Sequence, residues 1–276
     1  MFNKKRLVAI LTGTLLVGSL VGCSAGGASN SGSGSSDSSK ITISGSTSVG
    51  PTMEILAEDY QKANKGTTIE VQQVGSSAGI TNTIDGTSQI GMSSRDLKDE
   101  EKSELKEYQI AIDGIAVITN SANKVKDLTL DQVKDIYTGK ITNWKEVGGN
   151  DADIVVVSRE DGSGTRDGFQ EIVGFESGDL TSNAQISDGS GNIKTTVQGN
   201  ENAIGYISFG YLDDSINSVK IGGVEPKEEN VYNDKYPISR PFLLVTKGEA
   251  SGDAKSFIDY VLSDAGQKTI EKQGFM

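Results

Sequence analysis

Histidine is missing from all 276 residues of the chain, and cysteine occurs only at position 23. The segment Gly75-Ser-Ser-Ala-Gly79 has the Gly-x-Ser-x-Gly spelling of a hydrolase nucleophile elbow, but no imidazole is available to take the proton of the serine. Zinc sites that use histidine are excluded for the same reason. The chain also has no Gly-x-x-x-x-Gly-Lys-Ser/Thr phosphate loop and no calcium-loop spacing.

These absences predict a protein that is not an enzyme, with no catalytic residues, no metal and no cofactor. A secreted phosphatase or esterase that activates Ser76 or Ser163 without histidine remains the alternative class, because a Ser-Lys arrangement is formally open.

Positive charge is also scarce, because the chain has 26 Lys and Arg but 38 Asp and Glu, which gives a formal net charge of −12. Such a surface disfavours nucleic acid and does not attract anions over long distances. An anion site in this chain must therefore act through donors that lie close to the anion.

The first residues are typical of an export signal over residues 1–22. Lys4, Lys5 and Arg6 precede an apolar run over 7–21 that is too short to span a membrane. Leu20-Val-Gly-Cys23 resembles the bacterial lipobox, so we expect Cys23 to carry a lipid; a catalytic or metal-binding thiol is the competing interpretation. Residues 23–39, the lipidated cysteine and a Ser/Gly-rich stretch, predict a flexible tether that holds the protein outside the cell membrane.

Beyond residue 40, short apolar strands alternate with helical patterns, which predicts an α/β fold with mostly parallel sheets flanked by helices. Helices are expected over 52–64, 80–85, 98–107, 128–136 and 254–267, strands over 68–74 and 203–209, and a strand followed by a helix over 154–175. Two segments, 109–119 and 236–246, are unusually apolar, and the prolines of the second restrict it to an edge or a crossing. We interpret both as crossings between two lobes, with 40–115 plus 240–276 in lobe 1 and 116–239 in lobe 2.

One stretch, Val155 to Phe169, combines the features of an anion site. A β-branched run leads into Arg159, and Gly162-Ser-Gly-Thr165 then begins a helix. The first N–H groups of a helix have no partner within it and lie at the positive end of its dipole. The alternative is an ordinary capped helix with a surface ion pair.

Two further turns repeat this pattern of strand, hydroxyl-rich turn and helix: Gly45-Ser-Thr-Ser48 and Gly75-Ser-Ser77. Three such turns that converge would surround one small anion with N–H and O–H donors, although each turn could also simply cap its helix.

The sequence closely resembles the phosphate-binding lipoproteins of the bacterial phosphate-specific ABC importer, a branch of the periplasmic-type substrate-binding proteins. The resemblance covers nearly all of residues 40–276 and rests on six motifs in the family's order: Ile43-Ser-Gly-Ser-Thr-Ser48, Val74-Gly-Ser-Ser-Ala-Gly79, Ile90-Gly-Met-Ser-Ser-Arg95, Gly139-Lys-Ile-Thr-Asn-Trp144, Ser158-Arg-Glu-Asp-Gly-Ser-Gly-Thr165 and Asn202-Ala-Ile-Gly-Tyr206. It implies a two-lobed fold, inorganic phosphate as ligand, and the membrane permease subunits of an ABC importer as partners.

The resemblance also implies a set of phosphate ligands, which fall on Thr47, Ser48 (with its backbone N–H), Ser76, Arg159, Ser163, Gly164 and Thr165. It implies that Asp161 pairs with Arg159 and fixes the guanidinium plane. Some members carry an aspartate where this sequence has Ser94, which we include as a ligand. Sulfate or molybdate therefore remain open as alternative ligands, because a serine repels neither. Trp144, Tyr206, Phe209 and Tyr211 are expected to be structural, since an aromatic face offers nothing to a small oxyanion.

Overall fold

The computed structural model describes residues 39–276. The predicted signal peptide, Cys23 and nearly all of the predicted tether lie outside these residues; Ser39, assigned to the tether, is the first residue of a strand. The strands are β1 (Ser39–Gly45), β2 (Thr67–Gln73), β3 (Ile90–Ser93), β4 (Leu105–Asn120), β5 (Asp127–Leu128), β6 (Val155–Arg159), β7 (Gln185–Ser187), β8 (Ala203–Ser208), β9 (Ile216–Ser218), β10 (Lys220–Ile221) and β11 (Ser239–Lys247).

The helices alternate with these strands along most of the chain. They are α1 (Gly50–Ala63), α2 (Ser76–Ile84), α3 (Asp99–Lys102), α4 (Leu130–Tyr137), α5 (Gly164–Val173), α6 (Gly189–Gln198), α7 (Glu228–Tyr232), α8 (Gly252–Leu262) and α9 (Asp264–Lys272), with the 3-10 turns η1 (Trp144–Val147), η2 (Ser177–Asp179) and η3 (Phe209–Tyr211).

One continuous sheet has the strand order β2-β1-β3-β11-β4-β8-β6-β7. β1 pairs in parallel with β2 and β3, and β6 pairs in parallel with β7 and β8. The strands between these two parallel sets are antiparallel, because β11 pairs with β3 and β4, and β4 pairs with β8. The sheet therefore consists of two parallel parts joined by the antiparallel strands β4 and β11.

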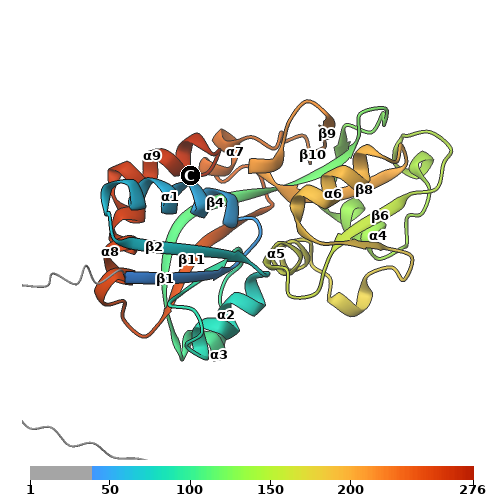
Figure 1. Ribbon diagram of the computed structural model, residues 1–276. Helices are drawn as coiled ribbons and strands as arrows, with labels where there is room; N and C mark the ends of the chain where they lie inside the picture. The colour runs from blue at the N-terminus through green and yellow to red at the C-terminus, as the bar shows by residue number, and fades with distance from the viewer. Residues whose placement is uncertain (1–38) are drawn as a thin grey trace, which may run out of the picture. The chain divides into compact units, whose positions relative to one another are not determined.

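Two large hydrophobic clusters follow this division of the sheet. Cluster A takes its buried residues from 41–111 and 242–275, and cluster B takes its buried residues from 115–238. β4 contributes Ala111 to cluster A and Ile115 to cluster B, so it passes from one to the other, and Figure 1 shows this long strand running between the two parts. β11 lies beside β4 over its whole length.

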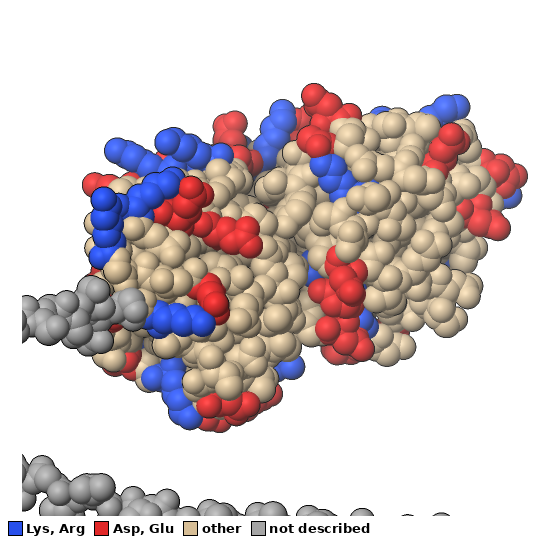
Figure 2. Space-filling view, viewed as in Figure 1, with Lys and Arg blue, Asp and Glu red and all other residues tan. Residues whose placement is uncertain are grey.

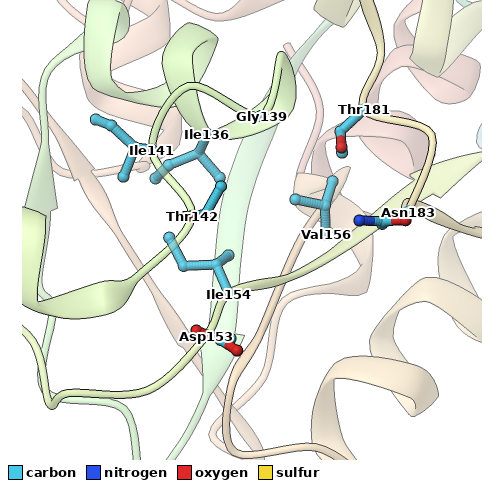
Figure 3. A pocket seen from close by; sticks show the side chains of 9 residues that line it. All are labelled: Ile136, Gly139, Ile141, Thr142, Asp153, Ile154, Val156, Thr181 and Asn183. Atoms are coloured by element: carbon cyan, nitrogen blue, oxygen red, sulfur yellow. The ribbon is translucent and has the colours of Figure 1, made fainter.

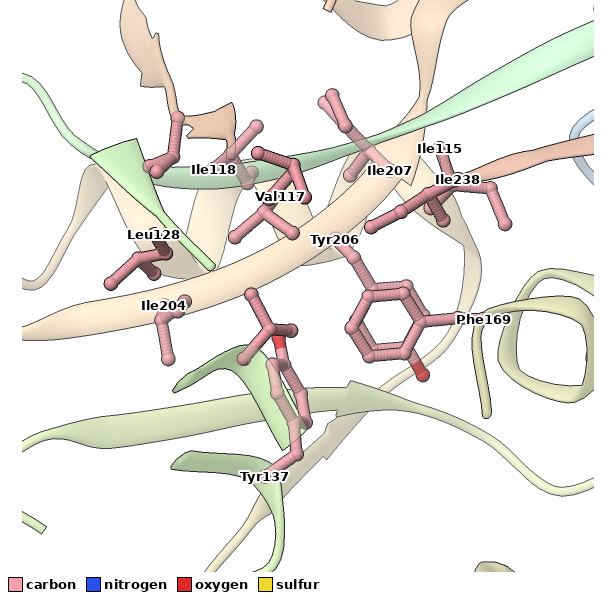
Figure 4. Packing of buried hydrophobic residues seen from close by; sticks show 14 of the residues in the cluster. Ile115, Val117, Ile118, Leu128, Tyr137, Phe169, Ile204, Tyr206, Ile207 and Ile238 are labelled. Carbon is pink, nitrogen blue, oxygen red and sulfur yellow. The ribbon is translucent and has the colours of Figure 1, made fainter. Parts of the chain in front are cut away.

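Aromatic packing in cluster B fixes helix α5 against the sheet. The rings of Phe169 and Tyr206 stack with centroids 4.0 Å apart and planes 7° apart, and Tyr137 packs edge-on against Phe169 at 4.9 Å. Figure 4 shows Phe169 and Tyr206 overlaid beneath the aliphatic side chains of β4 and β8. Because Phe169 lies in the second turn of α5, this packing holds the first half of the helix against the sheet.

The predicted helix over 98–107 is wrong in its second half. α3 ends at Lys102, and β4 starts at Leu105, which is buried and pairs with Lys247 of β11. The charged residues favour a helix, but pairing with β11 overrides local propensity.

The segment 236–246, predicted to lie at an edge or in a crossing, contains β11, which is an interior strand of the sheet. However, β3 pairs only with Leu243–Val245, and a register shift separates Phe242 from Leu243. Pro241 therefore sits where β11 has a neighbour on one side only, which a residue without an N–H tolerates.

The predicted final helix over 254–267 is two helices. Ser263 is extended, with φ −73° and ψ 164°, and its hydroxyl accepts from the N–H of Gly266 to cap α9. Leu262, the last residue of α8, is 41% exposed.

Candidate anion-binding site

The turn after β6 begins α5 with a capped N-terminus. Gly162 has a positive φ of 80°, which lets the chain reverse, and Ser163 follows as the N-cap, its hydroxyl accepting from the N–H of Arg166 at 3.3 Å. Arg159 precedes the turn, and only 1% of it is exposed. The predicted strand, turn and helix start are therefore present, with buried polar side chains at the helix start.

The two other hydroxyl-rich turns end strands of the sheet in the same way. Gly45-Ser-Thr-Ser48 joins β1 to α1, and Gly75 precedes α2, whose first residue is Ser76. Gly45 cannot carry a side chain, because a Cβ there would lie 2.2 Å from the carbonyl oxygen of Met92. The N–H of Ser48, which the resemblance implied as a ligand, donates here to the Ser46 hydroxyl at 3.1 Å.

Hydrogen bonds join these turns to the start of α5. The hydroxyls of Ser48 and Thr165 are 2.9 Å apart, and Arg159 Nη2 donates to Thr47 Oγ1 at 2.9 Å. The hydroxyls of Ser76 and Ser94 are 3.2 Å apart. Gly164 lies against Ser76 and Ser94, which links this pair to the start of α5. Seven predicted ligand residues therefore meet at one place, and the eighth, Ser163, is the residue before Gly164: Thr47, Ser48, Ser76, Ser94, Arg159, Ser163, Gly164 and Thr165.

Gly164 lies at the tightest point of this arrangement. A Cβ on Gly164 would be 2.3 Å from the Ser76 hydroxyl and 2.7 Å from the Ser94 hydroxyl. Only glycine allows the backbone of α5 to approach both serines this closely.

The predicted pairing of Asp161 with Arg159 is wrong. Arg159 Nε and Nη2 donate to the two carboxylate oxygens of Glu160 at 2.7 and 2.6 Å. The side chain of Asp161 is 94% exposed and pairs with Arg166 one turn into the helix. Glu160 reaches the guanidinium because it follows the strand end directly and is also held by the N–H of Gly189, whereas Asp161 lies in the turn and faces solvent.

Glu160 offsets the positive charge of Arg159. Burial disfavours the charged carboxylate, but the hydrogen bonds and positive charge of Arg159 outweigh this effect and lower the pKa of Glu160 below its ordinary value. Glu160 is thus an anion that neutralises the one guanidinium among the eight site residues.

Tyr206 and Tyr211, which were expected to be structural, hydrogen-bond to residues of the site. The hydroxyl of Tyr206 accepts from the N–H of Arg159 at 3.1 Å and pairs with the Ser158 hydroxyl at 2.8 Å. The hydroxyl of Tyr211 donates to the carbonyl of Thr47 at 3.1 Å. Tyr206 stands in one of the quoted motifs, which could have indicated its position near Arg159; no sequence signal identified Tyr211.

The chemistry of this site suits an anion. It offers hydroxyls, one neutralised guanidinium and the N-terminus of α5, which together donate hydrogen bonds without a large net charge. The face in Figure 2 carries red and blue side chains and no broad blue patch.

A separate pocket of about 240 Å³ lies elsewhere in the second parallel part of the sheet. Figure 3 shows it between the end of α4, the loop that follows and β6. None of the eight site residues lines it; its lining is Ile136, Gly139, Ile141, Thr142, Asp153, Ile154, Val156, Thr181 and Asn183. Trp144 is buried, and its indole N–H donates to the carbonyl of Asn202 at 2.9 Å. Both observations agree with the expected structural role.

Within residues 39–276, none of the helices has both the length and the apolar composition needed to cross a bilayer.

The fold and the site define a class of binding protein. A family model described as a PBP superfamily domain matches residues 25–265. A Clostridium perfringens protein, described as a substrate-binding protein of a phosphate ABC transporter and solved with bound phosphate, is 64% identical with a TM-score of 0.84. The alignment covers 86% of this chain and 98% of that one. An ABC-type phosphate transport receptor from Vibrio cholerae is 39% identical, with a TM-score of 0.76 over 86% of this chain and 99% of its own.

Curated relatives narrow the class further. The phosphate-binding protein PstS of Bacillus subtilis is 38% identical over 87% of this chain and 81% of its own length. The PstS of Borreliella burgdorferi is 31% identical over 86% of this chain and 89% of its own length. The chain belongs to the PstS family of phosphate-binding proteins within the PBP superfamily, which confirms the predicted two-lobed α/β fold class.

Proposed function

We propose that this protein binds inorganic phosphate between two lobes outside the cell membrane and delivers it to the permease of an ABC importer. The names of its relatives and the phosphate bound in the 64% identical structure support this function. The observation that carries it is the convergence of hydroxyls, Arg159 and the α5 N-terminus on one buried point.

The proposed ligands are the eight residues of this site. The hydroxyls of Ser48 and Thr165 hydrogen-bond to each other, as do those of Ser76 and Ser94, and each can turn its hydrogen toward an anion oxygen instead. Arg159 supplies the fixed cation, while Glu160 keeps the guanidinium plane in place and limits the net charge. Binding then rests on many dipoles and one partly neutralised charge, which permits release.

The lobes in this proposal are 40–115 plus 240–276 (lobe 1) and 116–239 (lobe 2). They are joined by β4, which contributes to clusters A and B, and by β11, which pairs with β4. Thr47, Ser48, Ser76 and Ser94 come from lobe 1, and the other four ligands come from lobe 2. Phosphate therefore stabilises a closed state because only that state brings both sets of ligands to it, and release follows when the permease favours the open state.

The proposal includes a lipid on Cys23 as the membrane anchor, with the following Ser/Gly-rich stretch as a tether. Mass spectrometry of the membrane fraction would detect the modified N-terminal cysteine, and Cys23→Ser should release the protein into the medium.

Calorimetry with purified protein tests phosphate binding directly. The Arg159→Ala variant should lose detectable binding, because the cation is removed and Glu160 is left to repel the anion. Lys145→Ala, which removes an exposed cation paired with Asp151, should bind as the wild type does. Thermal unfolding of both variants distinguishes lost binding from lost folding.

Two other functions can be tested with binding and turnover assays. Sulfate or molybdate as ligand would be recognised by competition with phosphate, and Ser94, which brings no carboxylate to the site, is the observation that favours testing them. Sustained turnover of a chromogenic phosphate ester would indicate an enzyme and contradict the proposed function.

A further inference from the structure

Arg95 is a buried cation beside the proposed site, and no ligand role is assigned to it. It follows Ser94, and only 3% of the residue is exposed. Its Nη1 and Nη2 donate to the two carboxylate oxygens of Glu101, each at 2.8 Å, while its Nε donates to Asp167 at 3.0 Å. Arg95 thus lies between two carboxylates on opposite sides.

The two carboxylates belong to different parts of the molecule. Glu101 is in α3, close to Leu97, which packs with Leu105 and Val245 of the lobe 1 strands. Asp167 is in α5, whose Phe169 is part of cluster B. Among the ion pairs within residues 39–276, Arg95–Asp167 alone joins a residue of proposed lobe 1 to one of proposed lobe 2.

We propose that Arg95 and Asp167 form a cross-lobe ion pair that holds the protein closed around its ligand and sets how slowly the ligand leaves. This inference rests on the proposed function, because it assigns a role in that binding cycle to a contact outside the ligand set.

The cross-lobe ion pair differs from the side-chain contacts that the proposed ligands make between the lobes. Ser48–Thr165 and Thr47–Arg159 are contacts among proposed ligands, so the anion would rearrange them when it binds. The Arg95–Asp167 contact uses no proposed ligand group and can persist with the anion in place. Its contribution to the closed state therefore adds to that of the anion.

Glu101 makes this ion pair reversible. If the lobes separate, Arg95 keeps both hydrogen bonds to Glu101, so a buried guanidinium is never left without a counter-charge. The side chain of Asp167 is already 31% exposed and can be hydrated when it is released. Opening therefore breaks the pair at a modest cost, as a transport cycle requires.

The test compares Asp167→Asn with Glu171→Gln, which removes the same charge from an exposed position one turn further along α5. Stopped-flow measurements should show phosphate leaving Asp167→Asn about tenfold faster, within the usual range of coupling between sites, with little change in the association rate. Glu171→Gln should keep the wild-type rates, and Asp167→Glu, which retains the charge, should recover most of the slow dissociation.

If Asp167 acted only by repelling the anion, removing its carboxylate would strengthen phosphate binding, which is the opposite of the faster dissociation expected here. Thermal unfolding of Asp167→Asn without phosphate checks that the fold is intact. Equal dissociation rates in Asp167→Asn and Glu171→Gln overturn the cross-lobe ion pair while leaving phosphate binding in place.

Small-angle X-ray scattering without phosphate separates this proposal from the proposed function. Asp167→Asn should have a larger radius of gyration than Glu171→Gln if the ion pair favours the closed state. A wild type that binds no phosphate would refute the proposed function. The comparison of radii still tests the ion pair in that case, because equal radii of gyration in Asp167→Asn and Glu171→Gln would overturn it.

Discussion

Arg240 of β11 and Asp113 of β4 face each other in the register of the two crossing strands, with Arg240 Nη2 2.8 Å from Asp113 Oδ2. Both side chains are buried. The other carboxylate oxygen of Asp113 accepts from the Ser208 hydroxyl at 2.9 Å, and Arg240 Nη1 donates to the carbonyl of Ser94 at 3.0 Å. One buried ion pair therefore ties both crossing strands to the start of η3 and to a residue of the proposed site.

Asp113→Asn should destabilise the protein by about 3–5 kcal/mol, because it leaves Arg240 as a buried charge without a counter-charge. Chemical denaturation measures this change in the free energy of unfolding. The matched control is Asp259→Asn, which breaks an exposed pair with Lys255 and should cost less than about 1 kcal/mol. Equal losses in the two variants would contradict a structural role for the pair.

Gly164→Ala should abolish phosphate binding and leave the fold intact. The new methyl group would lie 2.3 Å from the Ser76 hydroxyl, a distance that the closed arrangement cannot accommodate, whereas separated lobes would remove the clash. Calorimetry should show an affinity at least about a hundredfold lower, the loss typical of about 3 kcal/mol of strain.

The control for this change is Gly178→Ala, where a Cβ would meet nothing within 4 Å. It should bind phosphate as the wild type does. Tight binding by Gly164→Ala would mean that the close approach of α5 to Ser76 is not part of the liganded state.

The sequence predicted much of this site because its polar residues stand in recognisable local patterns. Gly162-Ser-Gly-Thr165 follows a β-branched run, and the same order of strand, hydroxyl-rich turn and helix occurs at Ser48 and Ser76. β1 and β2 are parallel and end at one edge, which brings the turns at Ser48 and Ser76 together. β6 runs in the opposite direction in the sheet, so its turn reaches the same place from the other parallel part.

The partners of the arginines could not be predicted in the same way. Glu160 and Asp161 are adjacent carboxylates, and their side-chain directions decide which one meets Arg159. The bonds from Arg95 to Asp167 and from Arg240 to Asp113 join residues 72 and 127 positions apart in the chain. Sequence spacing carries no information on such contacts, just as it did not show that pairing with β11 turns Leu105 into the start of a strand.

Acid should weaken the fold partly through Glu160. Its pKa in the folded protein is lowered below the ordinary 4.5, so its stabilising contribution is complete above pH 4.5 and is lost as the pH falls through the lower, folded-state value. The free energy of unfolding of the wild type should therefore fall below pH 4.5.

Glu160→Gln should reduce this dependence on pH. The difference in stability between wild type and variant should be largest near neutral pH and should shrink as the pH falls below 4.5. Denaturation at several pH values measures it, and a constant difference across that window would show that Glu160 does not carry the effect.

Ser94 should limit the selectivity of the site for phosphate over sulfate. Its buried hydroxyl pairs with Ser76 and can serve either anion, whereas an aspartate accepts the proton of hydrogen phosphate and repels sulfate, which has none. Ser94→Asp should therefore lower the affinity for sulfate at least about tenfold more than the affinity for phosphate, since like charges brought together in an interface cost several kcal/mol. Competition calorimetry measures both affinities.

Ser94→Ala is the control, because it removes the hydroxyl without adding charge and should lower the affinities for both anions to a similar degree. If Ser94→Asp changes the two affinities in the same ratio as Ser94→Ala, selectivity arises elsewhere, and the acceptors among the other hydroxyls become the residues to vary.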